Sequence, residues 1–192
     1  MLQGAWTAEA ARRLSNEFDA EGFDVFCPHC DKRTGRSLDS HVKTGRIISW
    51  VGNELKRWSQ FAWPDIAVVD RNTKKVLLLS EVEEGKPQPK VVIGDIVATL
   101  LGDHITFAPK SQDELTVGPW TTFSFFAKST GKGSGEQQLR MLEQKVNEAR
   151  MNFSTPNSTV KEIIIDSYQS ESELHEKLMS QTRKALMDLR KL

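Results

Sequence analysis

The sequence predicts an α/β fold, in which α-helices flank a central β-sheet. Apolar runs rich in β-branched and aromatic residues, bounded by turn residues, indicate strands in several parts of the chain. Longer segments with apolar residues at three- and four-residue spacing indicate helices between those strands. The chain has 192 residues and 38% hydrophobic content, which suits one domain with a core of its own. We expect residues 1–43 to form an N-terminal helix and knuckle, residues 44–128 the core, and residues 129–192 a C-terminal helix, strand and helix.

The N-terminal segment is expected to begin with a helix and a short strand. Thr7 can cap a helix that extends to Ala20, because the apolar residues after it recur at helical spacing. Gly22 ends this helix, and Phe23–Phe26 alternates like a strand.

A knuckle follows, Cys27-Pro28-His29-Cys30, which holds the two cysteines of the chain. A structural zinc site needs four ligands and no second CxxC follows, so the pattern favours a plain turn with two reduced thiols over zinc. In the zinc alternative His41 is the better third ligand, because His29 lies between the cysteines. Two cysteines are too few for a disulfide framework and fit a reducing compartment.

The segment Thr44–Gln60 has a helical pattern. Its apolar stripe consists of Ile47, Ile48, Val51, Leu55 and Trp58. Glu54 lies on the opposite face of this predicted helix, which leads directly into the next strand. Glu54 therefore either borders the acidic residues described below or is an ordinary exposed glutamate.

The stretch Trp63–Gly85 predicts a β-hairpin with acidic residues at its open end. Asp65 precedes one apolar strand, and Glu81 and Glu83 end the other. A polar turn joins the strands, so Asp65 comes level with Glu81. Side chains alternate along a strand, so Glu81 and Glu83 point the same way and Glu84 points the other way.

Three carboxylates are thus expected to converge at the end of this hairpin. Like charges a few ångströms apart resist joint ionisation unless a cation neutralises them. Because the stretch offers oxygen ligands and neither sulfur nor imidazole, Mg²⁺ or Mn²⁺ is favoured over zinc. The alternative is a set of solvated acids at a strand end.

A rigid loop with two prolines follows the hairpin and leads into a predicted helix, Val91–Leu101. The residues expected to face inward are Ile93, Ile96, Val97, Leu100 and Leu101. Lys86 and Lys90 lie close to the acids in sequence, where they either contact a phosphate or are solvated.

The second half of the chain alternates strand and helix patterns. We expect strands at His104–Phe107, Trp120–Lys128 and Lys161–Tyr168, and a helix at Glu136–Phe153. A capping box of Ser170 with Glu173 opens the last helix. Its expected buried stripe is Leu174, Leu178, Ala185, Leu189 and Leu192.

A glycine-rich loop stands between the strand that ends at Lys128 and the helix that follows. The Walker pattern requires glycine where Phe126 stands and Ser or Thr where Gly133 stands, which argues against nucleotide binding. Lys128 and Lys132 are instead candidate contacts with a nucleic-acid backbone.

Charge and hydropathy limit the partners of the chain. The 26 basic and 26 acidic residues cancel, so DNA binding must depend on a local basic face. The N-terminus lacks the apolar core of a signal peptide, and no run of residues is long enough to span a bilayer. We therefore expect a cytoplasmic protein that does not associate with a membrane.

The order of elements around Pro64-Asp65 and Glu81-Val82-Glu83 resembles the PD-(D/E)xK nuclease superfamily. The resemblance covers roughly residues 44–107 and implies a restriction-endonuclease-like core, with a mixed central β-sheet flanked by α-helices. Glu83 stands where the family usually has lysine, as in a minority of members that include some type II restriction enzymes. A competing alignment takes Glu84-Gly85-Lys86 as a literal ExK, but Glu81 follows the apolar strand more directly, and a glycine weakens the strand.

The resemblance also implies roles for residues. Asp65, Glu81 and the backbone carbonyl of Val82 would ligate Mg²⁺ or Mn²⁺, and Glu83 would act as a base or hold a second ion. Glu54 matches a position where some members carry an additional acid.

The function that the resemblance implies is a Mg²⁺-dependent endonuclease that cuts double-stranded DNA. The small size suits a homodimer that makes one cut in each strand. The sequence does not separate a type II restriction enzyme from a repair or junction-cleaving nuclease. The alternative from another class is a non-catalytic module of this fold that binds nucleic acid or protein, which the neutral charge and the missing lysine favour.

Overall fold

The structure, a computed structural model, describes residues 4–30, 41–85, 88–108, 114–129 and 134–190. A central five-stranded sheet has the order β1-β4-β5-β8-β9. Its strands are β1 (Phe23–Phe26), β4 (Ile66–Asp70), β5 (Val76–Glu83), β8 (Thr122–Lys128) and β9 (Glu162–Tyr168). β4 runs antiparallel to both of its neighbours, β1 and β5, and β5, β8 and β9 are parallel. The expected mixed central sheet is confirmed.

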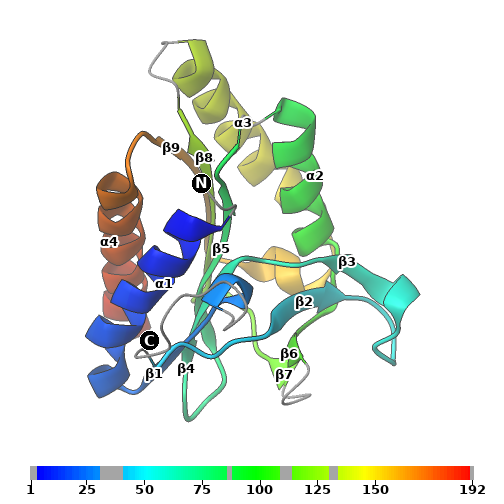
Figure 1. Cartoon of the computed structure of the whole chain (residues 1–192). Helices are drawn as coiled ribbons and strands as arrows, with labels where there is room; N and C mark the ends of the chain where they lie inside the picture. The colour runs from blue at the N-terminus through cyan, green and yellow to red at the C-terminus, as the bar shows by residue number, and fades with distance from the viewer. Residues whose placement is uncertain (1–3, 31–40, 86–87, 109–113, 130–133, 191–192) are drawn as a thin grey trace.

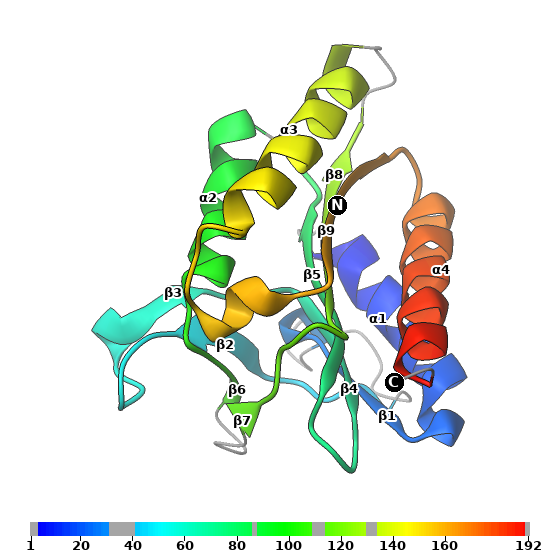
Figure 2. The ribbon, with the colours of Figure 1, turned by 180° about the vertical axis from the view of Figure 1, so that it is seen from behind.

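Two pairs of helices cover the two faces of this sheet (Figures 1 and 2). On one face lie α1 (Ala5–Phe18) and α4 (Glu171–Leu189), and on the other lie α2 (Pro89–Leu100) and α3 (Ser134–Arg150). Short 3₁₀ turns are η1 (Asp19–Glu21), η2 (Pro28–Cys30), η4 (Arg57–Ser59) and η5 (Pro156–Thr159). The expected flanking helices are therefore confirmed.

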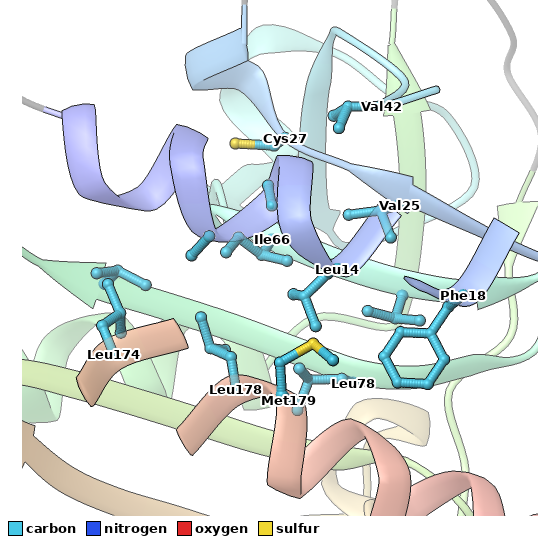
Figure 3. Close-up of a cluster of buried hydrophobic side chains, with 14 of the residues drawn as sticks. Leu14, Phe18, Val25, Cys27, Val42, Ile66, Leu78, Leu174, Leu178 and Met179 are labelled. Atoms are coloured by element: carbon cyan, nitrogen blue, oxygen red, sulfur yellow. The ribbon is translucent and has the colours of Figure 1, made fainter. Parts of the chain in front are cut away.

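Each face of the sheet has its own apolar core. Figure 3 shows the core under α1 and α4, where Leu14 and Phe18 meet Leu178 and Met179 above the sheet residue Leu78. Leu14, Leu78 and Leu178 are completely buried. The second core lies under α2 and α3 and contains Ile96 and Phe125, both buried. Because helices cover both faces of the sheet, side chains on both sides of each strand are buried, which explains why the strands are nearly continuous runs of apolar residues.

The prediction of a helix at Thr44–Gln60 is wrong. This segment forms β2 (Arg46–Trp50), a bend, η4 and β3 (Gln60–Ala62). These strands belong to a second sheet of order β3-β2-β6-β7, with β6 (His104–Ala108) and β7 (Glu114–Leu115). Adjacent Ile47 and Ile48 are both buried, which a strand covered on two faces allows, and Gly52 has φ +85°, a left-handed conformation that ends the strand.

The other elements follow the sequence to within a few residues. In α4 the Ser170 cap is confirmed, because its hydroxyl accepts from the backbone N–H of Glu173 at 3.2 Å; the reciprocal bond of the predicted capping box is shifted by one residue, since the carboxylate of Glu173 accepts from the N–H of Gln169. Leu192, the last residue of the predicted stripe, lies outside the described residues. None of the helices in the described residues is both long and apolar enough to cross a bilayer.

The inward face of α2 differs from the prediction by one position. Ile96 and Leu100 are buried as expected, but Ile93 is 41% and Leu101 37% exposed, and Val92 is buried instead. The buried residues thus repeat at four-residue spacing through Val92, Ile96 and Leu100. This rotation turns Asp95 toward the hairpin acids, as described next.

Candidate active site

A cavity of about 130 Å³ lies at the end of β5. It is lined by Gly4, His29, Asp65, Glu81, Val82, Glu83, Glu84, Asp95 and Phe125. The structure therefore brings the hairpin acids Asp65, Glu81 and Glu83 to one place, together with residues from the N-terminal region and from α2. We call this space the acid cavity.

Strand pairing positions Asp65 in the acid cavity. The backbone N–H of Asp65 donates to the carbonyl of Ser80 at 2.9 Å, and Ile66 pairs with Ser80, so Asp65 comes level with Glu81 as predicted. The Asp65 carboxylate accepts the backbone N–H of Val82 at 2.9 Å through Oδ2. Its Oδ1 accepts from Nε2 of His29 at 2.7 Å. Both oxygens of this carboxylate are thus held in place.

Glu81 is the most perturbed acid of the cavity. Burial raises its pKa well above the ordinary value, and the nearby charges of Asp65, Asp95 and Glu83 raise it further. Glu81 pairs in register with Phe125 of β8, and both residues line the cavity. Among the described residues that line the cavity there is no lysine or arginine to offset a charge at this position.

The side chains of Glu83 and Glu84 form hydrogen bonds with different parts of the protein, as alternation along a strand predicts. The carboxylate of Glu83 accepts the N–H of Gly85 at 2.6 Å, and the hydroxyl of Tyr168 donates to the Glu83 carbonyl at 3.2 Å. Glu84 instead accepts from the N–H and the hydroxyl of Thr7, at 2.9 and 2.8 Å. Glu84 thereby caps the first turn of α1, where unsatisfied N–H groups and the helix dipole favour a negative charge.

Sequence reasoning missed two residues of the cavity, Asp95 and His29. Asp95 comes from α2, and burial together with Glu83 and Asp65 raises its pKa. The signal that could have found it was an acid directly before the buried Ile96, on the helix that follows the acidic strand. The hydrogen bond that His29 donates to the Asp65 carboxylate raises the pKa of His29. His29 had been considered only as a zinc ligand.

The knuckle is the structure that holds His29 in the cavity. Cys27 and Cys30 are both buried, and the Cys30 thiol donates to the carbonyl of Ala8 in α1 at 3.5 Å. Burial raises the pKa of Cys27, and the adjacent Cys30 raises it further, which favours the neutral thiol. His41, the proposed third zinc ligand, is exposed.

The donor set of the acid cavity fits a hard divalent cation. Five carboxylates and one imidazole line it, and its described lining includes neither lysine nor arginine. As the side chains stand, no three His, Cys, Asp or Glu groups in the described residues are arranged to hold an ion. Asp65 and Glu83 each accept a backbone N–H group, and a carboxylate oxygen that accepts one hydrogen bond keeps a second lone pair for a cation.

The tentative assignment of Glu54 to the metal site is not supported by its position. Glu54 lies in a bend after β2 instead of on a helix, and it is absent from the described lining of the acid cavity. Its side chain is 73% exposed and pairs with Lys56 at 2.8 Å. The assignment depended on the predicted helix at Thr44–Gln60, whose polar face was expected to border the acids. That segment forms strands and a bend instead.

The candidate nucleic-acid contacts are dispersed. Lys90 is exposed on the first turn of α2, whereas Lys128 at the end of β8 has its ammonium 3.7 Å from the ring centroid of Trp6. Lys86 and Lys132 lie outside the described residues.

No protein-family model, curated protein or solved structure matches this chain.

Proposed function

We propose that the protein is a Mg²⁺- or Mn²⁺-dependent endonuclease that hydrolyses phosphodiester bonds in DNA. The observation that carries this proposal is the acid cavity itself, where five carboxylates gather at the end of a strand in a mixed sheet. Carboxylates of like charge repel one another when they are buried together, and a bound cation would neutralise that repulsion. The resemblance of Pro64-Asp65 and Glu81-Val82-Glu83 to the PD-(D/E)xK pattern, in its ExE form, supports a restriction-endonuclease-like core.

Asp65, Glu81 and the backbone carbonyl of Val82 are the groups that would hold the ion. When bound, such an ion supplies an activated water and stabilises the negative charge that develops on the phosphate. Asp65 is already oriented by its bonds to Val82 and His29, so the protein fixes one ligand in advance. His29, whose side chain is 34% exposed, reaches Asp65 from the N-terminal knuckle and borders the cavity.

Glu83 and Asp95 form the second half of the proposed site. Each lines the cavity, and burial together with the charge of Glu83 raises the pKa of Asp95. We assign them to a second cation or, for Glu83, to proton transfer from the attacking water. The capping role of Glu84 at α1 favours Glu81-Val82-Glu83 over Glu84-Gly85-Lys86 as the functional pair.

A non-catalytic binding module is the second candidate. It is favoured by the present arrangement of the acids, in which no three described ligand groups are placed to hold an ion. Against it stands the enclosure of Glu81, which a binding surface does not need. Duplex DNA as a substrate, and a homodimer as the active state, stay predictions.

The test is cleavage of supercoiled plasmid with Mg²⁺ or Mn²⁺, because a single nick changes its mobility. We expect the wild type to relax or linearise the plasmid, and Glu81→Gln to lose at least about a hundredfold in rate. Glu54→Gln is the matched control, since it removes an exposed acid outside the cavity, and it should cut like the wild type. A wild type that neither cuts nor binds metal would leave the binding module as the function.

A further inference from the structure

The exposed aromatic side chains of the protein are concentrated in one short segment. Trp58 is 75%, Phe61 45% and Trp63 55% exposed. The other large apolar residues found exposed in the described chain are aliphatic or methionine. These three exposed rings lie within six residues of the sequence, and we call this segment the aromatic arm.

The aromatic arm leads along the sequence to a residue of the acid cavity. Trp58 lies in η4, Phe61 lies in β3 beside the buried Ala62, and Trp63 directly follows that strand. Figure 1 shows η4 and β3 projecting to the side of the central sheet. Trp63 is followed by Pro64 and then by Asp65, a residue of the cavity.

Basic residues accompany these rings. Between Arg46 and Trp63 the sequence has three basic residues, Arg46, Lys56 and Arg57, and one acidic residue, Glu54. The guanidinium carbon of Arg46 lies 6.0 Å from the ring centroid of Trp63. This local positive charge contrasts with the net charge of zero for the whole chain. The surface therefore complements a polyanion that also offers flat apolar faces.

The ring of Trp63 is held in a defined orientation. Its indole N–H donates to the side-chain oxygen of Gln60 at 3.2 Å, across one strand segment. A ring fixed before binding loses little rotational freedom when a base stacks on it.

We propose that the aromatic arm binds the unpaired bases of single-stranded DNA and leads that strand into the acid cavity. The proposal rests on the proposed nuclease function and names its substrate as DNA with a single-stranded segment. In a duplex the bases are stacked on each other, so their faces are closed to protein rings, whereas in a single strand each base exposes a face. A second copy of the chain is a poorer occupant, because two like basic surfaces would repel.

The experiment measures binding without cleavage. Fluorescence anisotropy in EDTA reports binding of a labelled oligothymidylate of about 20 nucleotides, longer than most single-strand sites, and of a blunt duplex of the same length. The variants are Trp58→Ala and Trp63→Ala. Met151→Ala is the matched control, because Met151 is also 75% exposed but lies after α3. Circular dichroism verifies that each variant is folded.

We expect the wild type to bind the oligothymidylate more tightly than the duplex. Each tryptophan variant should bind about 5- to 100-fold more weakly, and Met151→Ala should match the wild type. Equal affinity of folded Trp58→Ala and wild type, or a preference for duplex, overturns the proposal. So does a wild-type dimer that Trp58→Ala converts to monomers without any change in DNA binding.

This design separates the two proposals. If the protein binds the single strand through the aromatic arm but cleaves no DNA with any divalent ion, the binding proposal is supported and the nuclease proposal is rejected. If the protein cleaves blunt duplex with a metal ion, and Trp58→Ala and Trp63→Ala leave that cleavage unchanged, the nuclease proposal is supported and the proposal for the aromatic arm is rejected.

Discussion

The acid cavity and the aromatic arm place unusual residues in opposite environments. The cavity encloses carboxylates at the end of a central strand, where burial raises the pKa of Glu81. The arm exposes rings on the smaller sheet, with Trp58 open over three quarters of its surface. Burial strengthens electrostatic interactions and suits a site for chemistry, while exposure suits contact with a large ligand. The contrast suggests that one chain separates reaction and binding between its two sheets.

The largest effect expected from this contrast concerns stability. Leu78 of β5 is completely buried, so Leu78→Ala should lower the free energy of unfolding by about 2–5 kcal/mol through lost burial and a cavity. Trp58→Ala should change it by about 0.5 kcal/mol or less, because that ring is exposed. Urea unfolding measures both values. A Trp58→Ala variant as unstable as Leu78→Ala would show that the arm is part of the core and is not a binding surface.

The next effect is the pH dependence of metal affinity. The pKa values of Glu81 and His29 are both raised, so below them a proton must leave before a cation can bind. Affinity for Mn²⁺ should therefore increase as the pH rises, by about tenfold per unit for each proton released. Calorimetric titrations at several pH values in matched buffers measure this slope. Affinity that is constant or falls with rising pH would contradict the buried acid as a ligand.

The smallest effect is the stability of the metal-free protein. Because folding raises the pKa of Glu81, its contribution to stability is full below the ordinary value of 4.5 and is lost as the pH rises through the raised one. Glu81→Gln keeps the shape without the charge. In EDTA it should equal the wild type in acid and exceed it at neutral pH, by on the order of 1 kcal/mol.

Thermal unfolding at two pH values tests this last prediction. Added Mn²⁺ should stabilise the wild type and leave Glu81→Gln nearly unchanged, since only a folded state that binds the ion gains from it. A wild type more stable than Glu81→Gln at neutral pH in EDTA would show that the Glu81 charge is already compensated within the protein.

The two regions also differ in how far the sequence predicts them. The hairpin that carries Asp65 and Glu81 is a local structure, whose strands are joined by a short polar turn. Its open end, where Asp65 comes level with Glu81, was predictable from the sequence, but the register shift between Val68 and Val69 was not. The smaller sheet depends on β2 pairing with β6, which lies far along the chain. The spacing of apolar residues within the β2 segment alone contains no sign of that partner, and it favours a helix. The helical pattern therefore predicts Trp58 in an apolar stripe, whereas it is the most exposed ring of the arm.

The acid cavity was predictable only in part for a similar reason. Asp65, Glu81 and Glu83 lie on adjacent strands, and alternation is enough to bring them together. His29 reaches Asp65 only because β1 packs beside β4 and the knuckle packs on α1, contacts that no short sequence window contains. Asp95 depends on the rotation of α2, which the predicted stripe missed by one position.

Isothermal titration of Mn²⁺ into the purified protein tests the central claim most directly, because it needs no knowledge of the DNA target. The account predicts heat of binding for the wild type, loss of that heat in Asp65→Asn and Glu81→Gln, and wild-type behaviour in Glu54→Gln. Binding that survives both cavity substitutions, or a wild type that binds no divalent ion, would contradict the assignment of the acid cavity as a metal centre.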